Sequence, residues 1–141
     1  MDDWAGMPLL LADADAKARA GLARRLRHDG YLVFETGRGD EALSFAAVQR
    51  LAAAVIDARL GDMSGGLLAA RLRAIDSAIP VIVTAAGGMI ETERAAREAG
   101  IAHYRHKPVS PRRLAPIVER VIAAAGREPR MLAAQNRSRH G

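Results

Sequence analysis

The stretch PLLLADADAKAR, residues 8–19, joins a run of apolar residues directly to two carboxylates. A continuous apolar run of this length is typical of a strand that is covered on both faces, as in a parallel sheet. Asp13 follows the run, and Asp15 precedes a segment with the spacing of a helix, with Ala14 between the two acids. The stretch therefore predicts a buried strand, a helix, and a pair of carboxylates where the two connect.

The same order, a short apolar run and then a longer amphipathic one, recurs about five times along the chain. Leu68, Leu72 and Ile75 show the helical part of this pattern, because they are spaced by four residues and then by three. Such an alternation indicates an α/β fold, a doubly wound parallel sheet with helices on both faces. The predicted strands are residues 8–13, 31–35, 53–57, 79–84 and 101–106.

Residues that favour helix ends agree with these positions. Asp15 is suited to cap the first helix, and Ser110 followed by Pro111 is suited to begin the last one. Gly30 and Gly100 stand where a helix ends with a left-handed residue.

The composition of the 141 residues, 50% hydrophobic and 26% charged, indicates one globular domain. The chain has no cysteine, which excludes disulfides and thiol catalysis and favours a cytoplasmic location. No apolar run approaches the roughly 18 residues of a membrane span, so we expect no membrane partner. The net charge of +5 comes mainly from arginine. An Ala- and Arg-rich composition can follow from codon bias alone, and we do not expect this chain by itself to bind nucleic acid.

We predict that the domain spans residues 8–126, after an N-terminal tail at residues 1–7. Residues 127–141 contain four arginines, a single Glu128, Pro129 and a polar ending. This composition is typical of a basic C-terminal tail or linker.

Four polar residues follow or end predicted strands: Asp13, Asp57, Thr84 and Lys107. The carboxyl ends of parallel strands meet at one edge of a sheet, where ligands bind. Carboxylates there suit Mg²⁺, and a hydroxyl and an ammonium suit a phosphoryl group beside the metal. Each residue alone has a simpler role, such as a helix cap for Asp13 or a solvated surface position for Lys107. Their occurrence at four equivalent positions favours a shared site.

Residues 7–126 resemble a response-regulator receiver domain, the phosphoacceptor half of two-component signalling. The motifs that match stand in the family's order and spacing: Asp13 after an apolar strand, VIDARLGDMSGG at 55–66, IPVIVTA at 79–85 and AGIAHYRHKPVS at 99–110. The resemblance implies a flavodoxin-like (βα)5 fold with strand order 2-1-3-4-5. It also implies a signalling domain and not an enzyme.

The resemblance further implies that Asp57 accepts a phosphoryl group from a histidine kinase or a phosphotransfer protein. Mg²⁺ would be held by Asp13, Asp57 and the backbone carbonyl of Arg59. Thr84 and Lys107 would contact the phosphoryl oxygens.

Signal output, by the same resemblance, would involve Thr84 and Tyr104 as switch residues. The partners implied are a downstream protein target and a second copy of the chain, bound through the face of the fourth helix, fifth strand and fifth helix. The Lys107-Pro108 peptide bond would be cis.

Two positions depart from the family's pattern. Ala14 stands where the second of two adjacent acids normally ligates Mg²⁺ directly, with Asp15 or water as the available substitute. Because Mg²⁺ affinity rises with ligand charge, this departure predicts weaker binding, and less crowding of carboxylates predicts a more stable metal-free fold. Gly61 stands where proline is usual, which predicts a looser loop after Asp57.

Three other functions stay open at this point. A degenerate pseudo-receiver, acting as a phosphorylation-independent protein-interaction module, would follow from the loss of the acid at Ala14. The chain could be the regulatory half of a DNA-binding response regulator, although no helix-turn-helix pattern follows residue 126. A small flavodoxin-like enzyme or flavin carrier is least favoured, because the Thr/Ser-rich phosphate loop expected after the first strand is absent.

Overall fold

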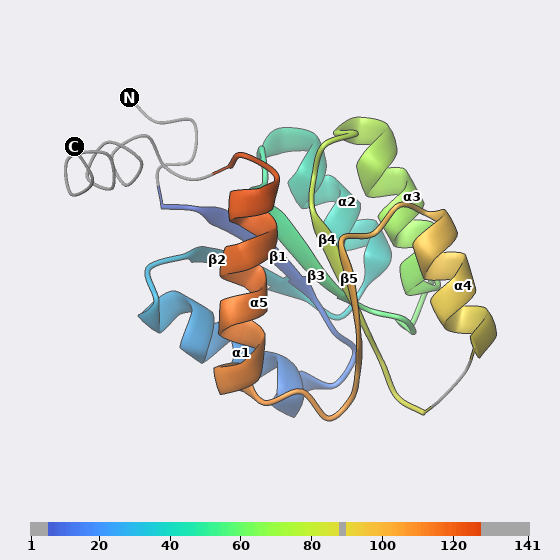
Figure 1. Cartoon of the computed structure of the whole chain (residues 1–141), viewed down its shortest axis with the longest axis horizontal. Coiled ribbons are helices and arrows are strands. Elements are labelled where there is room, and N and C mark those ends of the chain that lie inside the picture. The colour runs from blue at the N-terminus through green and yellow to red at the C-terminus, as the bar shows by residue number, and fades with distance from the viewer. Residues whose placement is uncertain (1–5, 88–89, 128–141) are drawn as a thin grey trace.

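Five parallel strands form one sheet in the order β2-β1-β3-β4-β5 (Figure 1). The computed structural model describes residues 6–87 and 90–127, so the predictions for residues 1–5 and 128–141 lie outside the described residues. The strands are β1 (Pro8–Ala12), β2 (Leu32–Thr36), β3 (Ala53–Asp57), β4 (Val81–Ala85) and β5 (His103–His106). Each of the five predicted strands is therefore present, with ends displaced by no more than two residues.

A helix follows each strand. The helices are α1 (Ala16–His28), α2 (Gly39–Val48), α3 (Gly65–Ile75), α4 (Ile90–Glu98) and α5 (Pro111–Ala124). Helices α1 and α5 lie side by side on one face of the sheet, and α2, α3 and α4 cover the other (Figure 1). This arrangement confirms the predicted doubly wound α/β fold with flavodoxin-like strand order.

The strand side chains alternate between two buried clusters. Leu9 and Leu11 of β1 pack with α1 and α5, whereas Leu10 and Ala12 pack with α2 and α3. All five β1 residues are buried, as the continuous apolar run predicted. Complete burial of a leucine contributes about 1.5–3 kcal/mol, so β1 fixes the centre of the sheet by packing on both faces.

The predicted helix ends are also present. The Asp15 side chain accepts hydrogen bonds from the amides of Lys17 and Ala18, and Ser110 caps α5 through the amide of Arg113. Gly30 and Gly100 have φ of +101° and +80°, the left-handed conformation that glycine adopts without strain. These caps fix where the chain enters and leaves the helices around the sheet edge.

Residues at both predicted tail boundaries pack on the domain. The Leu32 amide donates to the Gly6 carbonyl at 2.6 Å, and Met7 packs against the cluster under α1 and α5. Arg127 is only 4% exposed, and its guanidinium donates to the Leu51 carbonyl at 2.7 Å and to Asp76 at 2.9 Å. Arg127 therefore belongs to the folded domain and not to the tail to which the sequence assigned it.

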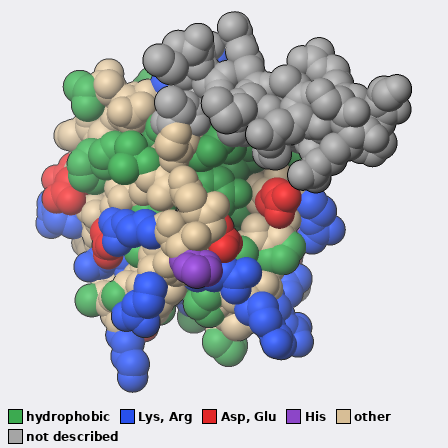
Figure 2. Space-filling view, turned by 90° about the vertical axis from the view of Figure 1, so that its left-hand side faces the viewer, with side chains coloured by type: hydrophobic (Ala, Val, Ile, Leu, Met, Phe, Trp, Pro, Cys, Tyr) green, Lys and Arg blue, Asp and Glu red, His purple; other side chains and the backbone are tan. Residues whose placement is uncertain are grey.

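The surface carries its basic residues among acidic ones on the face shown in Figure 2. Lys and Arg side chains lie mostly over the lower part of this face, and Asp and Glu side chains lie mostly above them or between them. Among the described helices, none has both the length and the apolar character needed to traverse a bilayer.

Candidate functional site

The four predicted site residues lie together at the carboxyl edge of the sheet. Asp57 and Thr84 are paired neighbours on β3 and β4, and the Asp13 amide donates to the carbonyl of Thr36, the last residue of β2. A surface pocket at this edge is lined by Asp13, Asp15, Thr84, Lys107 and Pro108, among others. The strand ends thus gather carboxylates, a hydroxyl and an ammonium in one place, as parallel strands require.

Lys107 connects the two carboxylates. Its Nζ lies 3.0 Å from Asp13 Oδ2, 3.1 Å from Asp13 Oδ1 and 3.0 Å from Asp57 Oδ2. Lys107 is not a solvated surface residue, the simpler role considered for it, because its side chain is only 22% exposed, with Asp13 at 2% and Asp57 at 12%. The Lys107-Pro108 peptide bond is cis, as the resemblance implied.

The electrostatics of this cluster follow from burial and from the close charges. Burial raises the pKa of Asp13, and hydrogen bonds from the Asp15 amide and Lys107 offset this increase only in part. Burial lowers the pKa of Lys107, but hydrogen bonds and charge from Asp13 and Asp57 together outweigh it, so the pKa of Lys107 is raised. Lys107 is therefore a firmly protonated cation between two acids.

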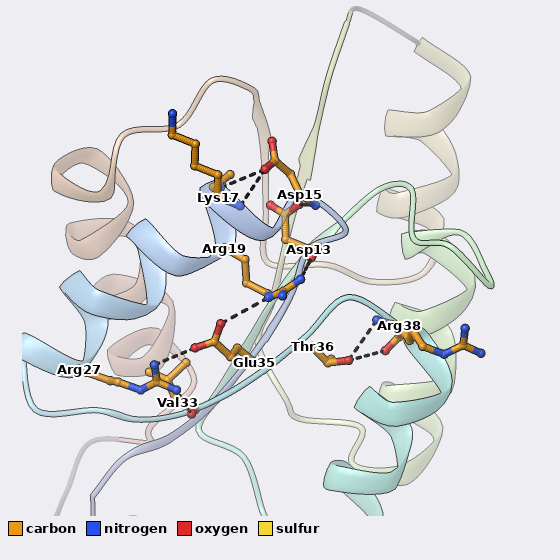
Figure 3. A network of polar contacts seen from close by, with 10 residues as sticks. Asp13, Asp15, Lys17, Arg19, Arg27, Val33, Glu35, Thr36 and Arg38 are labelled. Carbon is orange, nitrogen blue, oxygen red and sulfur yellow. Dashed lines mark hydrogen bonds and ion pairs between the residues drawn. The ribbon is translucent and has the colours of Figure 1, made fainter.

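A polar network on the α1 side supports the backbone at Asp13 (Figure 3). Arg19 donates to the Asp13 carbonyl at 2.7 Å and contacts Glu35 at 3.4 Å. Glu35 also accepts from Arg27 at 2.7 Å, and Arg27 donates in turn to the Val33 carbonyl. The network connects the end of β1 to α1 and β2. It therefore holds the Asp13 backbone on the side of α1 and limits movement of the Asp13 carboxylate.

On the other side of the site, the loop after β3 folds back onto Asp57. The Arg59 amide donates to Asp57 Oδ1 at 3.2 Å, so the two Asp57 oxygens face different donors. The Ala58 amide donates to the Thr84 carbonyl at 2.7 Å, and the Gly65 amide to the Ala58 carbonyl at 2.8 Å. A Cβ at Gly65 would lie 2.2 Å from the Asp57 carbonyl oxygen, so only glycine fits where α3 begins.

Asp62 makes a long-range contact near the site that its sequence position did not predict. Its carboxylate accepts from the amides of Gly39 and Asp40, at 2.7 and 2.8 Å, at the start of α2. The loop after Asp57 was expected to be loose, but Asp62 holds it through hydrogen bonds to residues 23 and 22 positions earlier in the chain. A carboxylate five residues after a predicted strand resembles any surface acid, and no local pattern singles it out.

Ala14 and Asp15 occupy the exposed connection between β1 and α1. The Asp15 carboxylate is engaged in capping α1, and those amide hydrogen bonds lower its pKa. Within residues 6–87 and 90–127, no three His, Cys, Asp or Glu side chains gather closely enough to hold a metal. The side-chain donors that face one another at this edge are the carboxylates of Asp13 and Asp57.

This donor set still fits Mg²⁺. The ion keeps several waters and commonly uses one or two carboxylates in proteins. Asp13 and Asp57 share one cation already, the Lys107 ammonium, which shows that their oxygens converge on a common point. The backbone carbonyl of Arg59 would be the third protein ligand.

Tyr104, the expected switch residue, is buried in the cluster beneath α3 and α4, at 7% exposed. Its ring meets the His106 ring edge-on with centroids 5.5 Å apart. The Tyr104 hydroxyl is buried and has no hydrogen-bond partner among the described residues. Burial raises the pKa of Tyr104, and an unpaired buried hydroxyl of this kind costs free energy that an outward position would recover.

Comparison with protein families identifies the family to which the chain belongs. The family model for the response regulator receiver domain matches residues 9–119. The transcriptional regulatory protein PrrA of Mycobacterium tuberculosis is 36% identical over 115 residues, which cover 82% of this chain and 48% of PrrA. The chain thus spans about half the length of the curated relative that it matches.

Solved structures are similar over nearly their full lengths. A putative response regulator from Chloroflexus aurantiacus has a TM-score of 0.77 and 30% identity, covering 83% of this chain and 98% of that one. A CheY-like receiver domain protein from Methanospirillum hungatei has a TM-score of 0.81 and 23% identity, covering 84% and 95%. The second likeness concerns the fold alone.

Proposed function

The chain belongs to the response regulator receiver domain family, and on that premise we propose that Asp57 is its phosphoacceptor. Receiver domains act in two-component signalling and generally bind Mg²⁺. The observation that carries the proposal is the position of Asp57. Its carboxylate stands at the carboxyl end of β3, with one oxygen near Lys107 and the other near the Arg59 amide.

The proposed reaction is a transfer from a phosphohistidine on a histidine kinase or a phosphotransfer protein. An Asp57 carboxylate oxygen attacks phosphorus, the phosphorus–nitrogen bond breaks, and the imidazole leaves with the electron pair of that bond. Lys107 lies 3.0 Å from Asp57 Oδ2 and supplies positive charge where the phosphoryl oxygens arrive. Thr84, paired with Asp57 on the neighbouring strand, offers a hydroxyl to the same oxygens.

Bound Mg²⁺ would neutralise charge on the transferring group and on Asp57. The ion would be held by Asp13, Asp57 and the Arg59 carbonyl. Asp15 would not be a main ligand, because its carboxylate accepts the hydrogen bonds that cap α1. Asp13 is fixed for this role by the Arg19 contact to its backbone carbonyl. Since cysteine is absent from the chain, we also propose a cytoplasmic setting for the reaction.

The proposed output is a change in protein–protein contacts on the face of α4, β5 and α5. Tyr104 and Thr84 occupy neighbouring strands between the acceptor and this face. Movement of Thr84 toward a phosphoryl group would leave room for Tyr104, whose hydroxyl has no hydrogen-bond partner among the described residues. The partners proposed for the face are a downstream protein or a second copy of the chain.

The test is incubation with a small phosphodonor and Mg²⁺, followed by intact-mass measurement. We expect one phosphoryl group on the wild type and on Glu98→Gln, which changes an exposed carboxylate of α4. Asp57→Asn should take up none. Labelling that persists in Asp57→Asn would place the acceptor elsewhere, and an unlabelled wild type would favour the pseudo-receiver.

A transcriptional output is the second candidate, because PrrA is named a transcriptional regulatory protein and this chain matches about half of it. In that case the receiver would control a DNA-binding partner or a further segment, and would not itself contact DNA. Measuring DNA binding of the described domain alone should then give no specific complex.

A further inference from the structure

Helix α2 begins without a side-chain cap from its own segment. Arg38 occupies the N-cap position and makes no capping hydrogen bond there, although the first amides of a helix need acceptors. The Asp62 carboxylate supplies them, with Oδ1 on the Gly39 amide at 2.7 Å and Oδ2 on the Asp40 amide at 2.8 Å. The start of α2 therefore depends on a residue from the loop after β3.

A close apolar contact accompanies these hydrogen bonds. A Cβ on Gly39 would lie 2.4 Å from the Met63 sulfur, so the loop sits directly against the helix backbone. Gly39 is itself buried. Two adjacent loop residues, one charged and one apolar, thus fasten the loop to the same turn of α2.

The fastened segment leads directly to the acceptor. The Leu60 amide donates to the Met63 carbonyl at 3.0 Å, and the backbones of Arg59 and Ser64 form an isolated bridge. The Arg59 amide then donates to Asp57 Oδ1 at 3.2 Å. Residues 58–64 consequently form one short hairpin-like unit between α2 and the Asp57 carboxylate.

We propose that Asp62 is a positioning residue, which acts through residues 58–64 to hold the Arg59 backbone against Asp57. The proposal rests on the proposed function of Asp57, and it names a residue that touches neither the metal ligands nor the phosphoryl group. Gly61 makes this anchor necessary, because glycine leaves the segment more conformational freedom than any other residue would.

The negative charge of Asp62 suits this role. A carboxylate at a helix N-terminus is stabilised by the helix dipole, and its hydrogen bonds to amides are stronger than those of a neutral acceptor. The Gly39 and Asp40 amides lower the pKa of Asp62, so the anchor stays ionised at neutral pH. Asn at this position would keep the shape and lose the charge.

The experiment compares the wild type with Asp62→Ala, Asp62→Asn and Glu41→Ala. Glu41 is a matched control, because it is an exposed acidic residue in the same first turn of α2. Amide hydrogen exchange is followed by NMR at Gly39, Asp40 and Arg59. Mg²⁺ titrations and initial rates of phosphoryl uptake from a small phosphodonor are measured on the same samples.

Asp62→Ala should accelerate exchange at Gly39 and Asp40 and also at Arg59, raise the Mg²⁺ dissociation constant several-fold, and slow phosphoryl uptake several-fold. Asp62→Asn should lie between it and the wild type, and Glu41→Ala should leave Arg59 exchange and Mg²⁺ binding unchanged. Adding Gly61→Pro to Asp62→Ala should restore slow amide exchange at Arg59 and the wild-type Mg²⁺ affinity. The Gly39 and Asp40 amides should still exchange fast. A Cβ at Gly61 would meet nothing within 4 Å, so the substitution begins in open space.

A purely structural cap would give a different pattern. If exchange accelerates only at Gly39 and Asp40, while Arg59 and Mg²⁺ binding match the wild type, the proposal is overturned. If Asp62→Ala does not fold, Asp62→Asn carries the same comparison. Arg59 exchange needs neither metal nor phosphodonor, so a wild type that takes up no phosphoryl group contradicts the proposed function and leaves this test standing.

Discussion

The ammonium of Lys107 lies 3.0 Å from Asp57 Oδ2, and the same atom lies 3.0 Å from Asp13 Oδ2. Residues 50 and 94 positions away from Lys107 in the chain are thus joined by one cation. Removing this cation would leave two carboxylates facing each other at the sheet edge, one of them almost fully buried.

Lys107→Met should therefore lower the metal-free stability by about 1–2 kcal/mol, because the buried Asp13 carboxylate loses a charged partner. The same change should tighten Mg²⁺ binding several-fold, since no ammonium then competes for the two carboxylates. Thermal melts with and without Mg²⁺ measure both effects. Lys17→Met is the control, because Lys17 is exposed and is the other lysine in the chain. Weaker Mg²⁺ binding in Lys107→Met would contradict a competition between the Lys107 ammonium and Mg²⁺ for the two carboxylates.

Ala14→Asp should restore a third carboxylate beside the site. A carboxylate about 4 Å from a unit charge contributes roughly 4 kcal/mol at an effective dielectric near 20, and desolvation and repulsion from Asp13 and Asp57 offset most of this. A net gain of about 1 kcal/mol would tighten Mg²⁺ several-fold. Metal-free melting temperature should fall, because three acids then share the edge. NMR titration and thermal melts follow the two effects, and equal Mg²⁺ affinity in both proteins would mean that Asp15 or water already replaces the ligand.

Glu35→Gln should reduce stability near neutral pH by about 0.5–1 kcal/mol, as expected for a part-exposed ion pair network. The Arg27 hydrogen bond, with the Arg27 and Arg19 charges, lowers the pKa of Glu35 below its usual value of 4.5. A lowered pKa means that the stabilisation is present above pH 4.5 and is lost as the pH falls through the folded-state pKa. The stability difference between wild type and Glu35→Gln should therefore shrink in acid. A stability difference between the two proteins that grows below pH 4.5 would contradict a lowered pKa of Glu35.

Gly65→Ala should destabilise the protein by about 1–3 kcal/mol, the usual cost of overpacking, because the new Cβ meets the backbone at Asp57. The clash should also move the Asp57 backbone and slow phosphoryl uptake. Gly61→Ala is the matched control in the same loop, since its Cβ meets nothing within 4 Å. Urea unfolding of both variants checks the prediction, and equal stabilities would contradict the close packing at Gly65.

The fold and the site residues differ in how far the sequence predicts them. Period and capping are local, so the strands and the caps at Asp15 and Ser110 could be placed from neighbouring residues alone. The positions of Asp13, Asp57 and Lys107 followed from the fold, because parallel strands bring their carboxyl ends together. Their mutual contacts did not follow, since the direction of a long lysine side chain depends on the charges it meets.

The sequence did not predict the contacts of Asp62 and Arg127, and both residues have partners far away in the chain. Asp62 is paired with a helix start more than 20 residues earlier, and Arg127 with residues 51 and 76 positions earlier. Nothing in the local sequence distinguishes either one from an ordinary charged surface residue. Arg127 was placed in a tail because basic, polar composition follows it, yet its own side chain is enclosed by the domain.

The Arg127 anchor has a mechanical consequence for signalling. It fastens the end of α5 to the turns that precede β3 and β4, at the amino ends of the strands, whereas Asp57 stands at their carboxyl ends. Five strand residues separate these levels, about 17 Å along the sheet. A segment attached after Arg127 would start from a fixed point beyond direct reach of a phosphoryl group. Such a segment could respond to phosphorylation of Asp57 only if whole helices shift against the sheet. The Arg127 guanidinium would then be the fixed point about which they move.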